Sequence, residues 1–148
     1  MRLSALYRYP VKSLRGEMLD AAEVGVRGLL HDRHWMLVNE QGRFLTQREL
    51  PRMVLVRPKV LGKALLLRAP GMPEIEILPG FDEDLAVQVW RDQCLARVMN
   101  PAADEWLSRF LGQSCRLVYL PDDRVRQVDQ DYAQVDDEVG FADGFPFL

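Results

Sequence analysis

Three stretches near the start of the sequence decide its fold and its chemistry: Tyr9-Pro10-Val11-Lys12-Ser13-Leu14, Gly28-Leu29-Leu30-His31-Asp32-Arg33-His34-Trp35-Met36 and Phe44-Leu45-Thr46-Gln47-Arg48. In each stretch, polar side chains stand beside strand-like apolar runs, where a cation or a hydroxyl needs a partner. The groups in question are Lys12, Ser13, Arg33 and Arg48. A lysine supplies a point charge, a serine a hydroxyl and an arginine a planar two-pronged donor. Together they are suited to holding a phosphate.

The dominant periodicity of the chain is two, with frequent turn signals, which predicts a mainly β fold. The strands that we expect are residues 2–9, 17–26, 35–38, 43–46, 53–56, 64–68, 74–78, 86–90, 94–99 and 115–120. Residues 39–42 and 91–93 have the composition of hairpin turns. Residues 34–38 alternate so little in polarity that we expect a strand buried on both faces. The prediction is a small β-barrel-like domain.

One helix interrupts this pattern, at about residues 101–111. Asn100 is a candidate N-cap and Pro101 suits the first helical position. Ala103, Trp106, Leu107, Phe110 and Leu111 recur at helical spacing, and Gly112 supplies the stop. We interpret this apolar stripe as core packing and not as part of a cofactor site.

We divide the chain into a barrel at residues 1–120, an acidic linker at 121–138 and a further apolar segment at 139–148. The linker is assigned from its many Asp and Glu residues and few core formers. The apolar segment carries three phenylalanines and either marks a missing interface or folds back on the barrel.

Composition and charge narrow the class of protein. Of the 148 residues, 48% are hydrophobic and 28% are charged, which is ordinary for a soluble globular domain. We find no export signal and no run long enough to span a bilayer, and we expect a cytoplasmic monomer without a membrane partner.

Residues 1–60 hold 11 Lys or Arg against six Asp or Glu, whereas residues 61–148 hold eight against 16. A basic front half suits an anionic ligand, and scattered solvated charges are the alternative. No basic patch interleaved with aromatics points to nucleic acid.

The remaining motifs carry weaker signals. Spacing alone favours a solvated lysine and a turn-forming serine at Lys12 and Ser13. Arg33 must pair with Asp32 or with an external anion, because an unpaired buried charge is costly. The alternative is that Asp32 forms a salt bridge with another arginine.

His31 and His34 bracket Asp32 but lack obvious further ligands, so we assign no metal site. Cys94 and Cys115 do not form a Cys-x-x-Cys pair, and buried free thiols are the better interpretation. We assign no catalytic residue.

The three opening stretches, taken together, resemble the N-terminal β-barrel domain of the MOSC family (molybdenum cofactor sulfurase C-terminal). The resemblance covers essentially the whole chain, is weak from residue 60 to 85, and extends to Phe141-Ala142-Asp143-Gly144-Phe145-Pro146-Phe147-Leu148, which looks like the opening of a MOSC domain proper. It implies an oxidoreductase that carries molybdenum-molybdopterin and reduces N-hydroxylated substrates.

Matched by motif, the resemblance assigns Lys12, Ser13 and Arg33 as contacts to the cofactor at the phosphate end of its pterin. Arg48 matches a family arginine of structural or entrance role. Cys94 and Cys115 do not match the metal-binding cysteine, which we expect in a second MOSC domain, joined in cis or in trans. On this hypothesis the 148 residues are not catalytically competent alone and bind the cofactor properly only with that second domain. The alternative is a free-standing β-barrel module that binds an anion or a protein.

Overall fold

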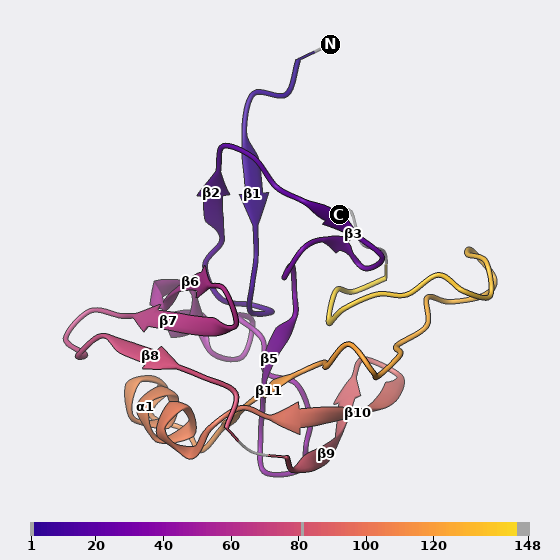
Figure 1. Cartoon of the computed structure of the whole chain (residues 1–148). Coiled ribbons are helices and arrows are strands. Elements are labelled where there is room, and N and C mark those ends of the chain that lie inside the picture. Colours follow the sequence, from indigo (N-terminus) through magenta and orange to yellow (C-terminus); the bar gives the residue numbers. More distant parts are fainter. Residues whose placement is uncertain (1, 81, 145–148) are drawn as a thin grey trace.

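A computed structural model of the chain describes residues 2–80 and 82–144, and Figure 1 shows its mainly β architecture with one α-helix. The predicted fold class, a small β-barrel-like domain with one packed helix, is confirmed. The sheet that organises the molecule is antiparallel and has the order β5-β11-β10-β9. Its strands are β5 (Trp35–Val38), β11 (Arg116–Tyr119), β10 (Asp92–Val98) and β9 (Asp84–Val89).

Three smaller units complete the barrel. A three-stranded antiparallel sheet contains β6 (Arg57–Leu61), β7 (Ala64–Arg68) and β8 (Ile75–Ile77). Two hairpins pair β1 (Leu6–Arg8) with β2 (Glu17–Leu19) and β3 (Val24–Gly25) with β4 (Gly28–Leu29). In Figure 1 the β1–β2 hairpin stands above the rest, while α1 lies beside β8. The chain therefore forms several small sheets instead of one continuous flat sheet.

The helix α1 (Pro101–Leu111) has the limits that its capping residues predict. The Asn100 side chain accepts a hydrogen bond from the Ala102 N–H at 2.9 Å. Gly112 adopts φ 70°, a left-handed conformation that favours glycine, and ends the helix. Asp104 then ties the helix to β11 by accepting from the Leu117 N–H at 2.7 Å. The apolar stripe is buried, as core packing requires.

The core has two main clusters, one on each face of β5 and β11. Trp35 and Leu37 face the cluster that α1 and the three-stranded sheet cover. Met36 and Val38 face the cluster that contains Phe44 and β9. All four residues of β5 are at most 2% exposed, which confirms the strand buried on both faces. Strand β5 therefore separates the two clusters of the core.

Four of the predicted strands need correction. The first, expected at residues 2–9, is limited to β1 (Leu6–Arg8). Residues 53–56 are not a strand, because Pro51 begins a 3-10 helix, η1 (Pro51–Leu55), that buries Met53. The strand follows at residues 57–61 instead. Residues 17–26 form two short strands, β2 and β3, rather than one. Residues 43–46 join the sheet only through isolated bridges, although the expected turn is present, with the Asn39 N–H donating to the Arg43 carbonyl at 2.8 Å.

Residues 139–142 pack back onto the barrel. Phe141 is fully buried in the cluster beneath β9, and Val139 and Ala142 are also buried. The buried guanidinium of Arg126 holds this segment: its Nη1 donates to the carbonyls of residues 140 and 142, each at 2.7 Å, and its Nη2 donates to Asp92 at 2.6 Å. Figure 1 shows the yellow segment turning back toward β3. The rest of the expected 139–148 segment, residues 145–148, lies outside the described residues.

Within the described ranges, no helix has the length and apolarity to cross a membrane.

We expect Phe141→Ala to lower the free energy of unfolding by about 3 to 5 kcal/mol, because it leaves a cavity in the core. Urea unfolding followed by circular dichroism measures this loss. Tyr132→Ala is the matched control, since Tyr132 is 77% exposed and its truncation should cost little. Equal losses for the two variants would contradict the packing of residues 139–142 on the barrel.

Candidate functional site

Two segments of the opening sequence lie side by side and carry the predicted site residues. The Arg33 N–H donates to the Tyr9 carbonyl at 2.7 Å, and the Trp35 N–H donates to the Pro10 carbonyl at 3.1 Å. The Lys12 N–H in turn donates to the Trp35 carbonyl at 2.9 Å. A third segment joins them, because the Phe141 N–H donates to the Arg33 carbonyl at 2.7 Å. Main-chain hydrogen bonds therefore fix the spacing between Lys12 and Arg33.

A cleft of about 370 Å³ opens where these segments meet, and we call it the cation cavity. All four cation or hydroxyl residues singled out in the sequence line it: Lys12, Ser13, Arg33 and Arg48. The other residues that line it are Tyr9, Leu14, Phe44, Thr46, Gln47, Trp90, Ala142 and Asp143. The structure thus brings the predicted residues together, while their role as cofactor contacts stays a prediction.

Lys12 is the most deeply buried cation of the cavity, with 7% of the residue exposed. Burial lowers the pKa of its ammonium, and the nearby Asp143 carboxylate only partly opposes this. Lys12 Nζ forms an ion pair with Asp143, whose side chain is 61% exposed. The ammonium also lies 5.5 Å from the centre of the Phe44 ring. The solvated lysine that spacing alone favours is therefore wrong.

Asp143 brings the negative charge of the cavity from the far end of the chain. Its carboxylate accepts hydrogen bonds from Lys12 Nζ and, at 2.9 Å, from Trp90 Nε1. Burial by itself would raise the pKa of this carboxyl, but these two donors and the positive charges around it bring the pKa below its usual value. Asp143 is therefore ionised at neutral pH and pairs with Lys12 inside the cavity.

Arg33 is held by its sequence neighbour and by an aromatic ring. Its Nη1 pairs with the carboxylate of Asp32, which confirms the predicted pairing with Asp32. The other oxygen of Asp32 accepts from the Tyr9 N–H at 2.8 Å, so the acid is fixed in turn. The guanidinium lies 5.0 Å from the centre of the Tyr9 ring. Its remaining N–H groups have no acceptor among the described residues.

The backbone at this cavity is strained. Four non-glycine residues in the described part of the chain have φ in the left-handed region: Ser13, His31, Arg33 and Trp90, at 64°, 65°, 45° and 56°. Three of them, all except His31, line the cation cavity. Such conformations cost on the order of 1 kcal/mol each and gather at functional sites. A hydrogen bond from Gln47 Nε2 to the Ser13 carbonyl, 2.8 Å long, supports the strained turn.

Gly140 lets the third segment approach this strained stretch. A Cβ at that position would lie 2.8 Å from the carbonyl oxygen of Arg33 and 3.1 Å from that of Asp32. A larger residue would push residues 140–143, and with them Asp143, away from Lys12.

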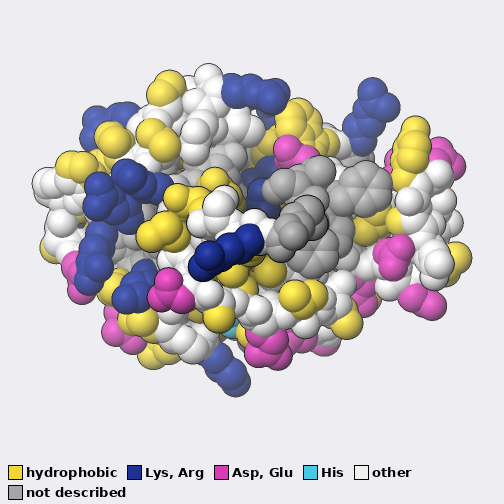
Figure 2. Space-filling model, turned by 90° about the horizontal axis from the view of Figure 1, so that it is seen from above, with side chains coloured by type: hydrophobic (Ala, Val, Ile, Leu, Met, Phe, Trp, Pro, Cys, Tyr) yellow, Lys and Arg dark blue, Asp and Glu magenta, His cyan; other side chains and the backbone are white. Residues whose placement is uncertain are grey.

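Charged side chains are unevenly distributed over one face of the molecule. In Figure 2 most Lys and Arg side chains gather on one side of the face shown, and Asp and Glu side chains are more frequent toward the other side and the lower edge.

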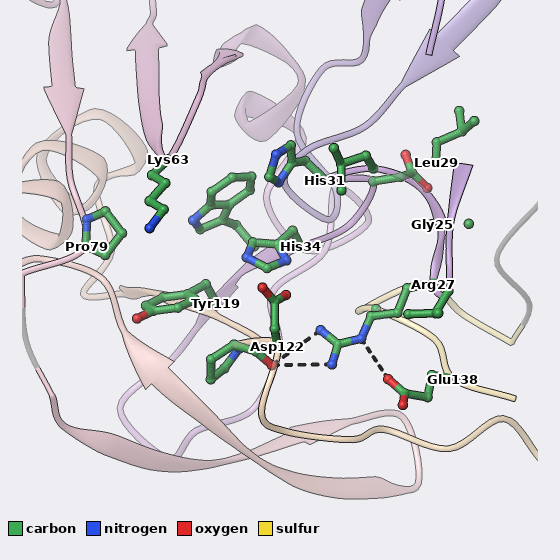
Figure 3. A pocket seen from close by; sticks show the side chains of 17 residues that line it. Gly25, Arg27, Leu29, His31, His34, Lys63, Pro79, Tyr119, Asp122 and Glu138 are labelled. Carbon is green, nitrogen blue, oxygen red and sulfur yellow. Dashed lines mark hydrogen bonds and ion pairs between the residues drawn. The ribbon is translucent and has the colours of Figure 1, made fainter. Parts of the chain in front are cut away.

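A second cavity, of about 520 Å³, lies on the other side of the residue 31–35 stretch. Four aromatic side chains, His31, His34, Trp35 and Tyr119, line it, and we call it the aromatic cavity. Figure 3 shows His31, His34 and Tyr119 around this hollow, with Arg27, Asp122 and Glu138 along one wall. Burial is the main cause that lowers the pKa of His34, to about 4, so this imidazole is uncharged at neutral pH. The described residues contain no cluster of three or more His, Cys, Asp or Glu side chains placed to hold a metal ion.

Sequence reasoning missed three residues of this region: Trp90, Arg126 and Asp143. Their contacts join positions far apart in the chain, such as 12 with 143 and 126 with 92. The only available signal was indirect, in that a buried lysine predicts a carboxylate partner somewhere. Which of the 22 acidic residues supplies it follows only from the fold.

Comparisons with known proteins identify the family. Residues 1–114 match the model of the MOSC N-terminal beta barrel domain, so the chain belongs to this family. A solution structure of a Bordetella bronchiseptica protein has the same fold, with a TM-score of 0.53 and 22% identity over 72% of this chain and 92% of that one.

Curated relatives are longer than this chain. It is 37% identical to the Xenopus laevis mitochondrial amidoxime-reducing component 1, covering 84% of this chain and 39% of the relative. It is 35% identical to the human molybdenum cofactor sulfurase, covering 76% of this chain and 13% of the relative. The chain thus spans less than half the length of either protein.

We expect the stability of the protein to fall between about pH 6.5 and pH 4 because of His34. In that range the unfolded chain protonates this imidazole, with an ordinary pKa of about 6.5, whereas the folded protein, with a pKa of about 4, does not. The contribution is complete above about pH 6.5 and amounts to about 2 to 3 kcal/mol lost by pH 4.5. Urea unfolding at both pH values, for the wild type and for His34→Phe, measures it.

His34→Phe should lose less stability on acidification than the wild type by that amount. His31→Phe is the control, since the pKa of His31 is also lowered by burial but the side chain is less enclosed. Identical acid sensitivity in His34→Phe and the wild type would contradict a buried, uncharged His34.

Proposed function

We propose that the chain is the N-terminal domain of a molybdenum-cofactor oxidoreductase that reduces N-hydroxylated substrates, and that its cation cavity binds the phosphate end of the pterin. The domain itself would contribute cofactor contacts and no catalytic residue. The observation that carries the proposal is the convergence of Lys12, Ser13 and Arg33 on one cavity in which an anion, the Asp143 carboxylate, is already bound.

The donor set of the cavity fits a phosphate. Lys12 offers an ammonium, Ser13 a hydroxyl and Arg33 the N–H groups that Asp32 leaves free, all on one cleft. Arg48 adds a third cation at the cavity, with its guanidinium 5.8 Å from the centre of the Trp90 ring. The three cations face two acids, Asp143 and the Arg33 partner Asp32, which leaves an excess of positive charge for an anionic group.

The metal ligand would come from elsewhere. Molybdenum supplies the two-electron redox chemistry when the cofactor is bound, and a thiolate is a suitable anchor for it. The chain has two cysteines, Cys94 and Cys115, and neither lines the cation cavity. Burial raises the pKa of both thiols, which disfavours the thiolate that a metal requires. We therefore propose that a second MOSC domain, in cis or in trans, provides the thiolate and joins this monomeric domain through the region after Pro121.

The relatives support the class of reaction, because one is named for reducing amidoximes, which are N-hydroxylated compounds. The alternative is a free-standing module that uses the same cavity for another anion or for an acidic protein segment. The excess of cations at the cavity is consistent with both the cofactor-binding domain and the free-standing module. A preference of the cavity for a pterin phosphate over inorganic phosphate distinguishes the two functions.

We expect inorganic phosphate to bind the chain weakly, with a millimolar dissociation constant, and to shift the amide resonances of residues 11–14 and 31–35. Lys12→Ala and Arg33→Ala should each weaken binding about tenfold, because each removes a charge-assisted hydrogen bond. Lys63→Ala is the control, since this exposed lysine lines the aromatic cavity instead. A pterin phosphate should bind at the same residues more tightly than phosphate.

Shifts at other residues, or unchanged affinity in both variants, would refute the anion site. Phosphate binding without any preference for the pterin phosphate would favour the free-standing module.

We expect Asp143→Asn to tighten phosphate binding by about tenfold, because it removes the carboxylate that competes for Lys12. Asp136→Asn makes the same charge change at an exposed position away from the cavity and should leave the affinity unchanged. Calorimetric titration of both variants with phosphate measures the difference. If the two variants tighten binding equally, the effect is one of net charge and Asp143 is not a competitor.

A further inference from the structure

The aromatic cavity has the size and lining of a small-molecule site, and the function proposed above does not use it. Its volume of about 520 Å³ falls within the range of about 300 to 1,000 Å³ that is typical of ligand pockets. It is bounded by residues 25–32 on one side and by residues from β5, β11 and the segment after β11 on the other. It lies on the opposite side of the residue 31–35 stretch from the cation cavity.

Four aromatic rings form a continuous wall of this cavity, with His34 at its centre. The His34 ring lies 4.6 Å from the Trp35 ring, 5.7 Å from the His31 ring and 5.9 Å from the Tyr119 ring, measured between ring centres. Such a wall favours a planar ligand that can stack on it or meet it edge to face.

One buried polar atom of the cavity lacks a partner. Trp35 is 2% exposed and lines the cavity, yet its Nε1–H has no acceptor among the described residues. Buried indole N–H groups are normally satisfied, as in Trp106, whose Nε1 donates to the Pro73 carbonyl at 2.7 Å. A ligand with an acceptor atom would satisfy Trp35 once the enclosed Nε1–H is opened to the cavity.

The charged groups on the walls are already neutralised. Arg27 donates to Glu138 at 3.1 Å and to the Leu120 carbonyl at 3.2 Å. Asp32 is paired with Arg33 and with the Tyr9 N–H. The imidazole of His34 is uncharged at neutral pH. The cavity therefore has no unpaired charge at its centre, and only the exposed Lys63 and Asp122 remain at its edge.

We propose that the aromatic cavity is a second binding site, for an uncharged planar aromatic molecule that carries a hydrogen-bond acceptor for Trp35 Nε1. Charged analogues of the same size bind less well, because the charged wall residues without an ion-pair partner, Lys63 and Asp122, are exposed and screened by solvent. An aliphatic molecule loses the ring contacts. This site is distinct from the cation cavity and its existence does not depend on phosphate binding.

Benzamide is a suitable probe, because it is planar, uncharged and has a carbonyl acceptor. Titration of the full chain, followed by the indole N–H resonances of its three tryptophans, should show a saturable shift for Trp35 and none for Trp106. Trp35→Phe keeps an aromatic ring and removes the donor, and it should weaken benzamide binding about fivefold to tenfold, as judged from the shifts of His31 and His34. Trp106→Phe is the matched control and should leave the affinity unchanged.

Tyr119→Leu provides a second variant in case Trp35→Phe fails to fold, and it should also weaken binding by loss of a ring contact. Benzylamine and benzoate, as charged analogues, should bind several-fold more weakly than benzamide. Lys12→Ala should bind benzamide as the wild type does, which separates this site from the anion site.

No saturable shift of Trp35 at millimolar benzamide would overturn the proposal. So would equal affinities for benzamide, benzylamine and benzoate, or equal effects of Trp35→Phe and Trp106→Phe.

Discussion

The main-chain pairing of residues 9–12 with residues 33–35 is the constraint on which the rest of the structure depends. These hydrogen bonds bring Lys12 and Arg33 to one cavity and direct their neighbours Asp32, His34 and Trp35 to the other. The backbone at Arg33 is left-handed, with φ 45°, and the Arg33 side chain lines one cavity while those of Asp32, His34 and Trp35 line the other. The same pairing therefore positions residues of both cavities.

A buried lysine then determines how the end of the described chain is used. An unpaired ammonium at the position of Lys12 would be costly, and Asp143 supplies the countercharge across 131 residues of sequence. Asp143 can reach it because Arg126 binds the carbonyls of residues 140 and 142 and because Phe141 is buried in the core. Removing the segment would leave Lys12 without its carboxylate partner and Arg126 with Asp92 alone. The packing of Phe141 and the polar contacts of Lys12 and Arg126 thus both hold residues 140–143 on the barrel.

Much of the fold could be predicted from the sequence where local signals decide it. Helix α1 has the predicted limits because Asn100, Pro101 and Gly112 are strong local signals. The strand predicted at residues 53–56 is wrong, because the apolar residues of a short 3-10 helix, followed by a strand that contains Pro58, give no clear period. For the site, the residue types of Lys12, Ser13 and Arg33 predicted an anion cavity. The pairing of Lys12 with Asp143 could not be predicted, since it depends on tertiary contacts that no local pattern records.

If the cation cavity binds an anion as we propose, its strained backbone would help a weak set of contacts to be specific. Ser13, Arg33 and Trp90 hold left-handed conformations that only the surrounding structure can impose. Asp32 fixes the Arg33 guanidinium and is itself fixed by the Tyr9 N–H, so the Arg33 side chain would lose little further freedom on binding the proposed anion. Folding has already ordered this side chain. The proposed anion would then have to replace one partner of Lys12, the largely exposed Asp143, while the rest of the cavity keeps the arrangement it already has.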